Sequence, residues 1–296
     1  MNLLSVLFLI VVSYNTENLF YPEEDGSFTR YKSKEENLAR VLTTIGEWDG
    51  VDVVGLQEVE NAKVVKRLCY TLRRGEYDFV HYDSPDRRGI DVALIYKKAR
   101  LDTLNTRAIK VNGVGTDGDS LVTRDILYVS ALVDKRDTMH FFVCHLPSQR
   151  GGAAQSEWKR ILAKRVLQSA IDSVRTIHED AKIVVMGDMN SAPRDDLRGL
   201  TNRMNEEPLK TKGTHKYQGQ WTCLDQFYLS PAVDSISTVS IFDAEWIQEP
   251  DEKYMGLKPK RTFSGVRYQN GYSDHLPIVL KIATDSVATS SSYDNR

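Results

Sequence analysis

Cysteine is scarce in this chain and does not occur in closely spaced pairs. The 296 residues contain three cysteines, Cys69, Cys144 and Cys223, and none belongs to a Cys-x-x-Cys pair. This spacing argues against a disulfide scaffold and against a cysteine-rich zinc site. Because each cysteine lies within an apolar pattern, we interpret all three as buried core thiols.

The chain also lacks a strong charge of either sign. Its formal net charge is −2, so no global basic field would collect polyanions. This weakens the case for a nucleic-acid partner without excluding one, since a local basic lining would be sufficient. The hydrophobic content of 41% is ample for one large core or for two domains.

The apolar N-terminus lacks the marks of a secretion signal. Residues 1–12 have no Lys or Arg before the apolar run and no small-x-small cleavage site after it. The run is too short to span a membrane. It leads directly into Ser13-Tyr14-Asn15, so we interpret it as a buried first strand, with a degenerate export signal or anchor as the alternative. Both a cytoplasmic and an exported protein therefore stay open.

Eight apolar runs rich in Val, Ile, Tyr and Phe predict β-strands. These runs occupy residues 51–56, 77–82, 91–96, 126–133, 139–145, 183–186, 224–229 and 278–282. The polar link 134–137 is short enough for a hairpin, which would make the fourth and fifth strands antiparallel partners.

Apolar residues recur at helical spacing in three further segments. These stripes occupy residues 38–45, 64–72 and 158–174. Hairpins mixed with separate helices favour two packed sheets with helices outside, within one domain. We assign residues 1–284 to this domain and predict that the Ser- and Asp-rich tail, 285–296, is disordered. The long polar connections 195–222 and 243–262 are candidates for substrate-facing loops.

Six short polar segments stand where apolar runs begin or end. They read SYNTENLF (13–20), LQEVEN (56–61), CHLPSQRGG (144–152), GDMNSAP (187–193), LDQFYLSP (224–231) and GYSDHLP (271–277). The polar side chains that they place at strand ends are Asn15, Glu58, His145, Asp188, Asn190, Asp225, Asp274 and His275. Carboxylates, amides and imidazoles at one rim of a sheet suit a hard metal ion and a phosphate group. The pattern therefore predicts a metal-dependent phosphoester hydrolase.

The carboxylates and amides among these residues each have a functional and a structural interpretation. Glu58 leaves a buried strand end and suits Mg²⁺ or Mn²⁺, with a charge at the start of the next helix as the alternative. Asp188 can orient and deprotonate water, and Asn190 can donate to a phosphoryl oxygen. An Asx turn is the alternative for that pair, and Asn15 taken alone is typical of a turn.

The histidines are open to the same two interpretations. His275 can act as a general base or as a cation that stabilises developing charge, with a surface turn as the alternative. Because neighbouring side chains diverge, Asp274 cannot easily orient His275, and Asp225 is the best candidate for that contact. His145 and Arg150, with the glycines that follow, suit a phosphate, unless Arg150 is merely solvated in a helix-entry loop.

Taken in order, these segments resemble the endonuclease/exonuclease/phosphatase superfamily from Ser13 to Ile282. This group includes the pancreatic-type deoxyribonucleases, abasic-site endonucleases, tyrosyl-DNA phosphodiesterases, neutral sphingomyelinases and inositol-polyphosphate 5-phosphatases. The resemblance is strongest to bacterial members, whose substrates are mostly unassigned. It is carried by the segments SYNTENLF, HLPSQRGG, LDQFYLSP and GYSDHLP. The resemblance implies a deoxyribonuclease I-like fold, a four-layer α/β sandwich of two packed mixed β-sheets flanked by helices.

The resemblance also implies a metal site. Glu58 matches the principal ligand of a Mg²⁺ or Mn²⁺ cofactor, Asn15 matches the amide beside it, and Asp274 matches an acid near the metal. Asn15, Arg150 and Asn190 are the residues expected to bind the substrate phosphate.

The remaining residues match the catalytic positions of the group. Asp188 matches the acid that orients the attacking water, and Asn190 the amide that holds this water or a phosphate oxygen. His275 and His145 match two histidines that contact the scissile phosphate, and Asp225 matches the acid paired with His275.

We therefore expect a divalent-metal-dependent phosphodiesterase or nuclease that uses in-line attack by an Asp188-activated water. The alternatives are a phosphatase or phospholipase-like hydrolase of small or lipid phosphoesters, and a non-catalytic binding module on the same fold. HLPSQRGG departs from the abasic-endonuclease pattern, and neither the lipid-facing hairpin of sphingomyelinases nor the phosphoinositide signature is evident. We expect a monomer with no transmembrane span and no obligate protein partner; its substrate is a phosphoester, with nucleic acid as one candidate.

Overall fold

The computed structural model describes most of the chain. The described residues are 7–22, 27–115, 118, 120–149, 151–207, 209–265 and 267–284. Residues 1–6, Arg150 and the tail 285–296 lie outside this set, so the predictions made for them stay predictions.

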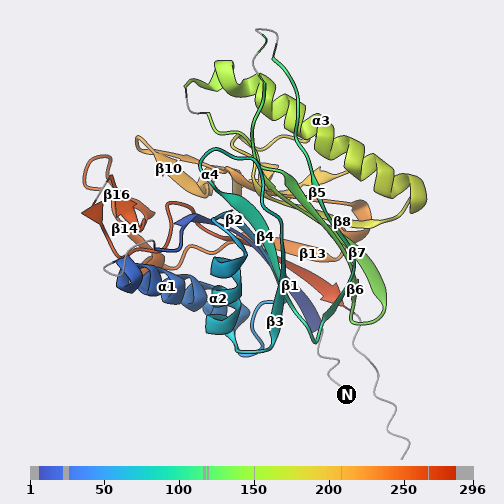
Figure 1. Cartoon of the computed structure of the whole chain (residues 1–296), viewed down its shortest axis with the longest axis horizontal. Coiled ribbons are helices and arrows are strands. Elements are labelled where there is room, and N and C mark those ends of the chain that lie inside the picture. Colours follow the sequence, from blue (N-terminus) through green and yellow to red (C-terminus); the bar gives the residue numbers. More distant parts are fainter. Residues whose placement is uncertain are drawn as a thin grey trace, which may run out of the picture.

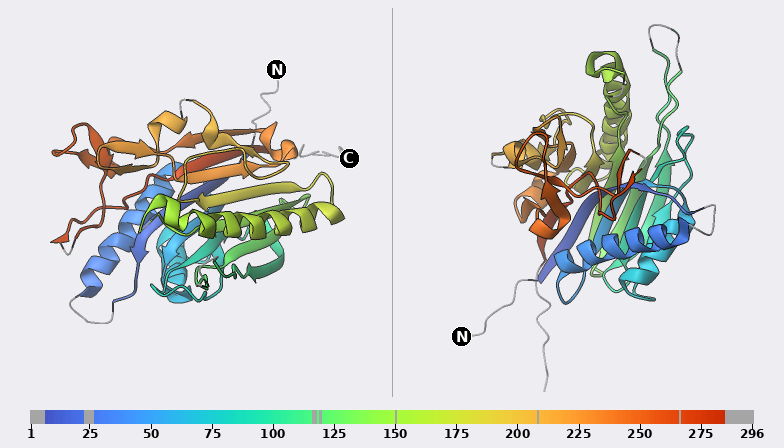
Figure 2. Two further views of the ribbon diagram at one scale, coloured as in Figure 1. Left: turned by 90° about the horizontal axis from the view of Figure 1, so that it is seen from above. Right: turned by 90° about the vertical axis from the view of Figure 1, so that its left-hand side faces the viewer.

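Two six-stranded mixed sheets pack face to face, and helices cover their outer sides (Figure 1, Figure 2). The first sheet consists, in spatial order, of β13 (Ser237–Ile241), β18 (Ile278–Thr284), β1 (Leu7–Leu19), β2 (Val53–Val59), β4 (Asp91–Lys97) and β3 (Tyr77–His81). The second consists of β5 (Leu101–Ile109), β6 (Ile126–Val133), β7 (Asp137–His145), β8 (Lys182–Asp188), β12 (Asp225–Leu229) and β9 (Thr201–Asn202). Helices α1 (Phe28–Gly46) and α2 (Ala62–Leu72) pack on the first sheet, and α3 (Ala153–Ile177) packs on the second. The predicted four-layer α/β sandwich is thus confirmed.

The central strands are buried on both faces. In β7, Phe141 and Val143 belong to the core between the sheets, whereas Phe142 and Cys144 lie in the core under α3. A strand covered on both sides has no polar face, so it reads as a continuous apolar run rather than an alternating one. This is why composition and flanking residues, rather than a period of two, revealed these strands.

All eight predicted strands and all three predicted helices are present; the strand predicted at 126–133 has the bounds of β6 (Ile126–Val133), and the other elements differ at one or both ends. The predicted hairpin is also present, since β6 and β7 pair antiparallel from Leu127↔Val143 to Val133↔Asp137. The three cysteines are free and buried, as expected. No helix among the described residues is long and apolar enough to cross a membrane.

The sequence did not reveal three strands of the sheets, β5, β9 and β13, or the structure of the long polar connections. Strand β5 lies at a sheet edge and exposes much of its length, and β13 has alternating burial with Ser and Thr outside. The connections and the segments around them contain η2 (Arg203–Asn205), α4 (Leu209–Lys212), β10 (His215–Tyr217), β11 (Gln220–Thr222), α5 (Pro231–Asp234), η3 (Glu245–Ile247), β14 (Gln248–Pro250), β15 (Leu257–Pro259), β16 (Phe263–Ser264) and β17 (Arg267–Tyr268).

The apolar N-terminal run is part of the first sheet from Leu7 onward. Strand β1 pairs antiparallel with β18 and parallel with β2, and Val11 and Val12 are fully buried. The interpretation of residues 7–12 as a first strand is therefore confirmed.

Candidate active site

The topology gathers the six polar segments at one edge of the sandwich. Strands β1 and β2 are parallel neighbours in one sheet, and β7 and β8 are parallel neighbours in the other, so each pair ends on the same side. Strands β12 and β18 run antiparallel to these neighbours and begin at the same edge. The segments that precede β12 and β18 therefore meet the segments that follow β1, β2, β7 and β8, although together they span most of the sequence.

Asp188 is the centre of this edge. Its Oδ2 accepts a hydrogen bond from Asn15 Nδ2 at 3.2 Å, and its Oδ1 accepts one from the Asn190 backbone N–H at 2.8 Å. The Nε2 atoms of His145 and His275 lie 3.6 and 3.9 Å from Asp188 Oδ2. The structure thus brings five predicted catalytic and binding residues into one cluster.

The backbone before Asp188 explains why a glycine precedes it. Gly187 has φ +141°, and a Cβ atom there would lie 1.9 Å from the Cys144 carbonyl oxygen. Only glycine permits this close approach of β8 to the end of β7. The glycine therefore lets His145 and Asp188, which are paired in register, face the same cluster.

Burial controls the charge of Asp188. The side chain is 3% exposed, and this loss of solvent raises the pKa of the Asp188 carboxyl group to about 6. His275 opposes the increase, whereas the carboxylates of Asp225 and Glu58 add to it. A carboxyl group with a pKa near neutrality is suited to accept a proton from water.

His275 is held by the acid that the sequence indicated. Its Nδ1 lies 2.7 Å from Oδ2 of Asp225, which is fully buried. Burial disfavours the charged ring, but the contacts with Asp225 and the nearby Asp188 outweigh it, and the pKa of His275 is held well above its usual value. The ring is therefore a cation at neutral pH, with Nε2 turned toward Asp188.

His145 carries no charge, in contrast to His275. It is buried, and both this burial and the neighbouring guanidinium of Arg124 hold the pKa of His145 well below its usual value. Arg124 also fixes the end of β7, because its Nε donates to the His145 carbonyl oxygen at 2.9 Å. Its Nη1 pairs with Asp86 Oδ2 at 2.7 Å. Sequence reasoning missed Arg124, which lies in a segment with no motif.

Glu58 faces the cluster rather than the helix after it. Helix α2 is capped by Asn61, whose Oδ1 accepts from the backbone N–H groups of Lys63 and Val64. Glu58 Oε2 accepts from the Asn18 N–H at 3.0 Å, and Oε1 lies 3.8 Å from His145 Nε2. Its backbone adopts φ +63°, an uncommon conformation for a non-glycine residue that is often found at functional sites. The helix therefore has its own cap, and the Glu58 carboxylate points into the rim.

The two amides are already engaged within the protein. Asn190 Nδ2 donates to the Leu146 carbonyl oxygen at 2.9 Å, so it ties the segment after β8 to the segment after β7. Asn15 Oδ1 accepts from the Glu17 N–H at 3.0 Å while its Nδ2 donates to Asp188. In this structure both amides orient the cluster, and their contacts with a phosphate or an ion stay predictions.

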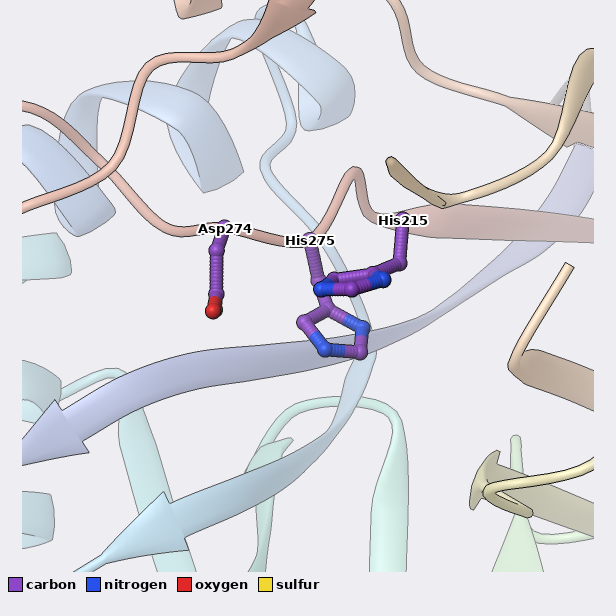
Figure 3. Close-up of side chains that lie close together, drawn as sticks. All are labelled: His215, Asp274 and His275. Carbon is purple, nitrogen blue, oxygen red and sulfur yellow. The ribbon is translucent and has the colours of Figure 1, made fainter. Parts of the chain in front are cut away.

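Asp274 lies beside His275 on the same loop, and two further residues approach it. Figure 3 shows Asp274, His275 and His215, whose potential ligand atoms lie within 4.8 Å of one another. The His215 ring lies over the His275 ring, with 4.8 Å between the ring centroids. Asp274 Oδ2 accepts from Arg261 Nη2 at 2.9 Å.

The carboxylates at the rim fit a hard divalent cation. Glu58 and Asp274 offer oxygen ligands, the type that Mg²⁺ and Mn²⁺ prefer. Asp274 groups with the nitrogens of His215 and His275 within 4.8 Å, and Glu58 is outside that group. His275 is already paired with Asp225, and the hydrogen bond from Arg261 engages only Oδ2 of Asp274. Because a hard cation prefers oxygen to nitrogen ligands, Glu58 and Asp274 are the better candidates.

Sequence reasoning missed several residues that complete the rim. His215 lies on the three-residue strand β10, within a connection that the sequence shows only as polar. Lys34 is buried on α1, and its one available signal is its position within the apolar stripe that continues to Leu38. Glu17 lies within SYNTENLF, but its contacts in the rim are with Lys34 and Arg261, which are distant in sequence.

The fold and the rim define a class of protein, the deoxyribonuclease I-like phosphoester hydrolases. Residues 10–284 match the model of the endonuclease/exonuclease/phosphatase family, and the chain belongs to that family. No curated protein matches the sequence.

Solved structures of the same fold cover nearly the whole chain. A humanised D. rerio TDP2 is 18% identical with a TM-score of 0.60, over 94% of this chain and 99% of that one. The Bacteroides thetaiotaomicron mannosyl-6-phosphatase Bt3783 is 15% identical with a TM-score of 0.61, over 93% and 100%. The human Nocturnin catalytic domain is 15% identical with a TM-score of 0.60, over 93% and 94%. At these identities the likeness shows the fold alone.

Proposed function

We propose that the chain hydrolyses phosphodiesters by in-line attack of a water molecule, with a divalent cation as cofactor. One observation carries this proposal: Asp188 stands between Asn15, His145 and His275 at the shared edge of both sheets. A base with a pKa of about 6 and a neighbouring imidazolium can assist the attack of water on phosphorus, the first by accepting a proton and the second by stabilising negative charge.

Each residue has a distinct part in this reaction. Asp188 accepts the proton of the attacking water, and Asn15 holds the carboxylate in place through the 3.2 Å hydrogen bond. The His275 cation, kept charged by Asp225, stabilises the negative charge that develops on the phosphoryl oxygens. His145 is neutral, and its Nε2 would donate a hydrogen bond to a phosphoryl oxygen of the substrate.

Glu58 and Asp274 would hold the cation. When bound, Mg²⁺ or Mn²⁺ would neutralise charge on the phosphoryl oxygens. The cations of Lys34 and Arg261 lie close enough to Glu58 and Asp274 to influence their electrostatics, so the carboxylates are not left uncompensated without the ion.

Two kinds of substrate remain in view, and the neighbouring structures represent both. A D. rerio TDP2 structure of the same fold contains a single-strand DNA product. The Bacteroides thetaiotaomicron neighbour is a mannosyl-6-phosphatase, which acts on a phosphomonoester. The formal net charge of −2 gives no general attraction to polyanions, and this favours the small-phosphoester phosphatase as the second candidate.

Removal of the metal is expected to abolish hydrolysis of every accepted substrate. The purified protein would be tested on plasmid DNA, single-stranded RNA, bis-p-nitrophenyl phosphate, sphingomyelin micelles and sugar or inositol phosphates, with Mg²⁺, with Mn²⁺ and with EDTA. We expect Glu58→Gln to lower activity at subsaturating metal by about tenfold or more, with recovery at high metal, because a principal ligand has lost its charge.

Salt separates the two kinds of substrate. Cleavage of nucleic acid should fall steeply as salt rises, because counterion release weakens binding, whereas hydrolysis of a small phosphoester should change little. Full activity in EDTA would contradict the metal-dependent mechanism. Binding of a phosphoester without turnover on the whole panel would favour a binding module instead.

A further inference from the structure

Arg261 joins two carboxylates that come from opposite ends of the chain. Its Nε donates to Glu17 Oε1 at 2.9 Å, and its Nη2 donates to Asp274 Oδ2 at 2.9 Å. The Glu17 and Asp274 side chains are 5% and 23% exposed, and Arg261 is 43% exposed. A planar guanidinium can hold two carboxylates in fixed directions, which a lysine ammonium cannot do.

The position of Arg261 is built into the fold rather than left to a loose surface loop. Its neighbour Thr262 donates its backbone N–H to Glu17 Oε2 at 2.6 Å. The buried Lys34 ammonium donates to Thr262 Oγ1 at 2.9 Å and also to the Glu17 carbonyl oxygen. A Cβ at Gly271 would lie 2.2 Å from the Arg261 carbonyl oxygen, so the loop before Asp274 packs directly on this segment. The guanidinium is therefore held from both the β1 side and the Asp274 side.

The contact with Arg261 makes Asp274 a weaker ligand for a cation. One of its two oxygens is occupied by Arg261, and the positive charge of the guanidinium offsets part of the carboxylate charge. A cation bound beside such a carboxylate would meet a weaker ligand and a nearby positive charge. It would bind less tightly and would remain a stronger acceptor of electron density from a phosphoryl oxygen.

We propose that Arg261 is a positioning residue that presents Asp274 to the divalent cation through one oxygen and keeps the affinity of the site for that cation low. This inference rests on the proposed function, because it takes Glu58 and Asp274 as the metal-binding carboxylates. Arg261, which would thus set the cation affinity, lies outside the six polar segments that carry the other site residues.

Binding of Mn²⁺, measured by isothermal titration calorimetry on the full chain, tests the proposal. Arg261→Gln keeps an amide donor but removes the charge, so we expect it to bind Mn²⁺ about threefold more tightly or better. Its kcat should nevertheless fall about tenfold or more, because Asp274 is no longer fixed. Arg261→Lys keeps the charge, so its Mn²⁺ affinity should stay near that of the wild type, but its kcat should fall because one ammonium cannot bridge both acids.

A matched control is available in Arg198, which forms an exposed ion pair with Asp172 at 2.8 Å on the outer surface near α3. Arg198→Gln makes the same chemical change and should alter neither Mn²⁺ affinity nor kcat. Thermal unfolding of each variant without metal shows whether it is folded. A merely structural role for Arg261 predicts weaker Mn²⁺ binding together with a lower Tm, and that result would overturn the proposal.

Glu58→Gln separates failure of this inference from failure of the proposed function. If Mn²⁺ binding to the wild type depends on Glu58 but is unchanged in Arg261→Gln, only the role of Arg261 is wrong. If Mn²⁺ binding does not depend on Glu58, the metal site of the proposed function is wrong, and the inference is overturned with it.

Discussion

Replacing Asp188 with Asn is expected to lower kcat on any accepted phosphoester by about 10²-fold or more, the usual loss when a general base is removed. Asn keeps the size of the side chain and can still accept one hydrogen bond, so the cluster should stay assembled. It cannot accept a proton from water. Steady-state kinetics on the best substrate of the panel give kcat and KM separately, and KM should change far less than kcat.

The pH profile gives this prediction a second readout. Because burial raises the pKa of Asp188 to about 6, the wild-type kcat should fall about tenfold per pH unit below pH 6 as the carboxylate takes up a proton. The residual activity of Asp188→Asn should lack this acid limb. Asp172→Asn removes an exposed carboxylate on α3 and serves as the control. A kcat for Asp188→Asn within about threefold of the wild type would contradict the role of Asp188 as the base.

The same substitution should also remove a pH-dependent loss of stability. A carboxyl group whose pKa is raised on folding, here from 3.8 to about 6, contributes stability that is present below pH 4 and is lost as the pH rises through 6. Above that range, the buried charge costs on the order of 2–3 kcal/mol, and the neutral amide of Asp188→Asn would not carry this cost. Urea unfolding at pH 4 and at pH 8 measures this effect. The stability of the variant relative to the wild type should rise by that amount between the two conditions.

The positions of most site residues could be predicted from the sequence because they follow directly from buried strands. Asp188 and Glu58 stand where apolar runs end, and the carboxyl ends of such strands meet at one edge of a sheet. The partner of His275 could also be predicted, because the adjacent Asp274 points elsewhere and Asp225 was the remaining acid at a strand start.

The residues that could not be predicted depend on contacts between distant segments. His215 lies on a three-residue strand whose position is set by a bridge to His275, and so short a strand has no pattern of its own. Arg261 and Glu17 are 244 residues apart, and each alone resembles an ordinary charged loop residue. Strand β5 was missed because an edge strand with exposed polar residues lacks the apolar signal of its buried neighbours. Local pattern thus reveals the buried framework, whereas the rim is completed by tertiary contacts.

Replacing Asp225 with Asn is expected to lower kcat by about 10²-fold or more, because the cation at His275 depends on this carboxylate. Asp225 is fully buried, and its Oδ1 has no hydrogen-bond partner among the described residues, so the contact with His275 through Oδ2 is its main compensation. Without the carboxylate, burial would dominate and the pKa of His275 would fall. The alkaline limb of the kcat profile should therefore move to lower pH in Asp225→Asn.

The free energy of unfolding should also depend on the ion pair between Asp225 and His275, and this dependence should vary with pH. Because the pKa of His275 is raised on folding, the pair contributes stability that is fully present below the unfolded value of about 6.5 and is lost as the pH rises through the folded value. Asp225→Asn should thus be most destabilising at acidic to neutral pH, by up to about 3 kcal/mol, and less so at alkaline pH.

A double-mutant cycle with His275→Gln tests whether these losses belong to the pair. Once either partner is gone, removing the other should cost much less, so the two losses of stability and of kcat should be strongly non-additive. Asp243→Asn, which removes the acid of an ion pair between half-exposed side chains, is the matched control and should show neither effect. Additive losses, or an alkaline limb that stays in place in Asp225→Asn, would mean that His275 does not act as a cation held by Asp225.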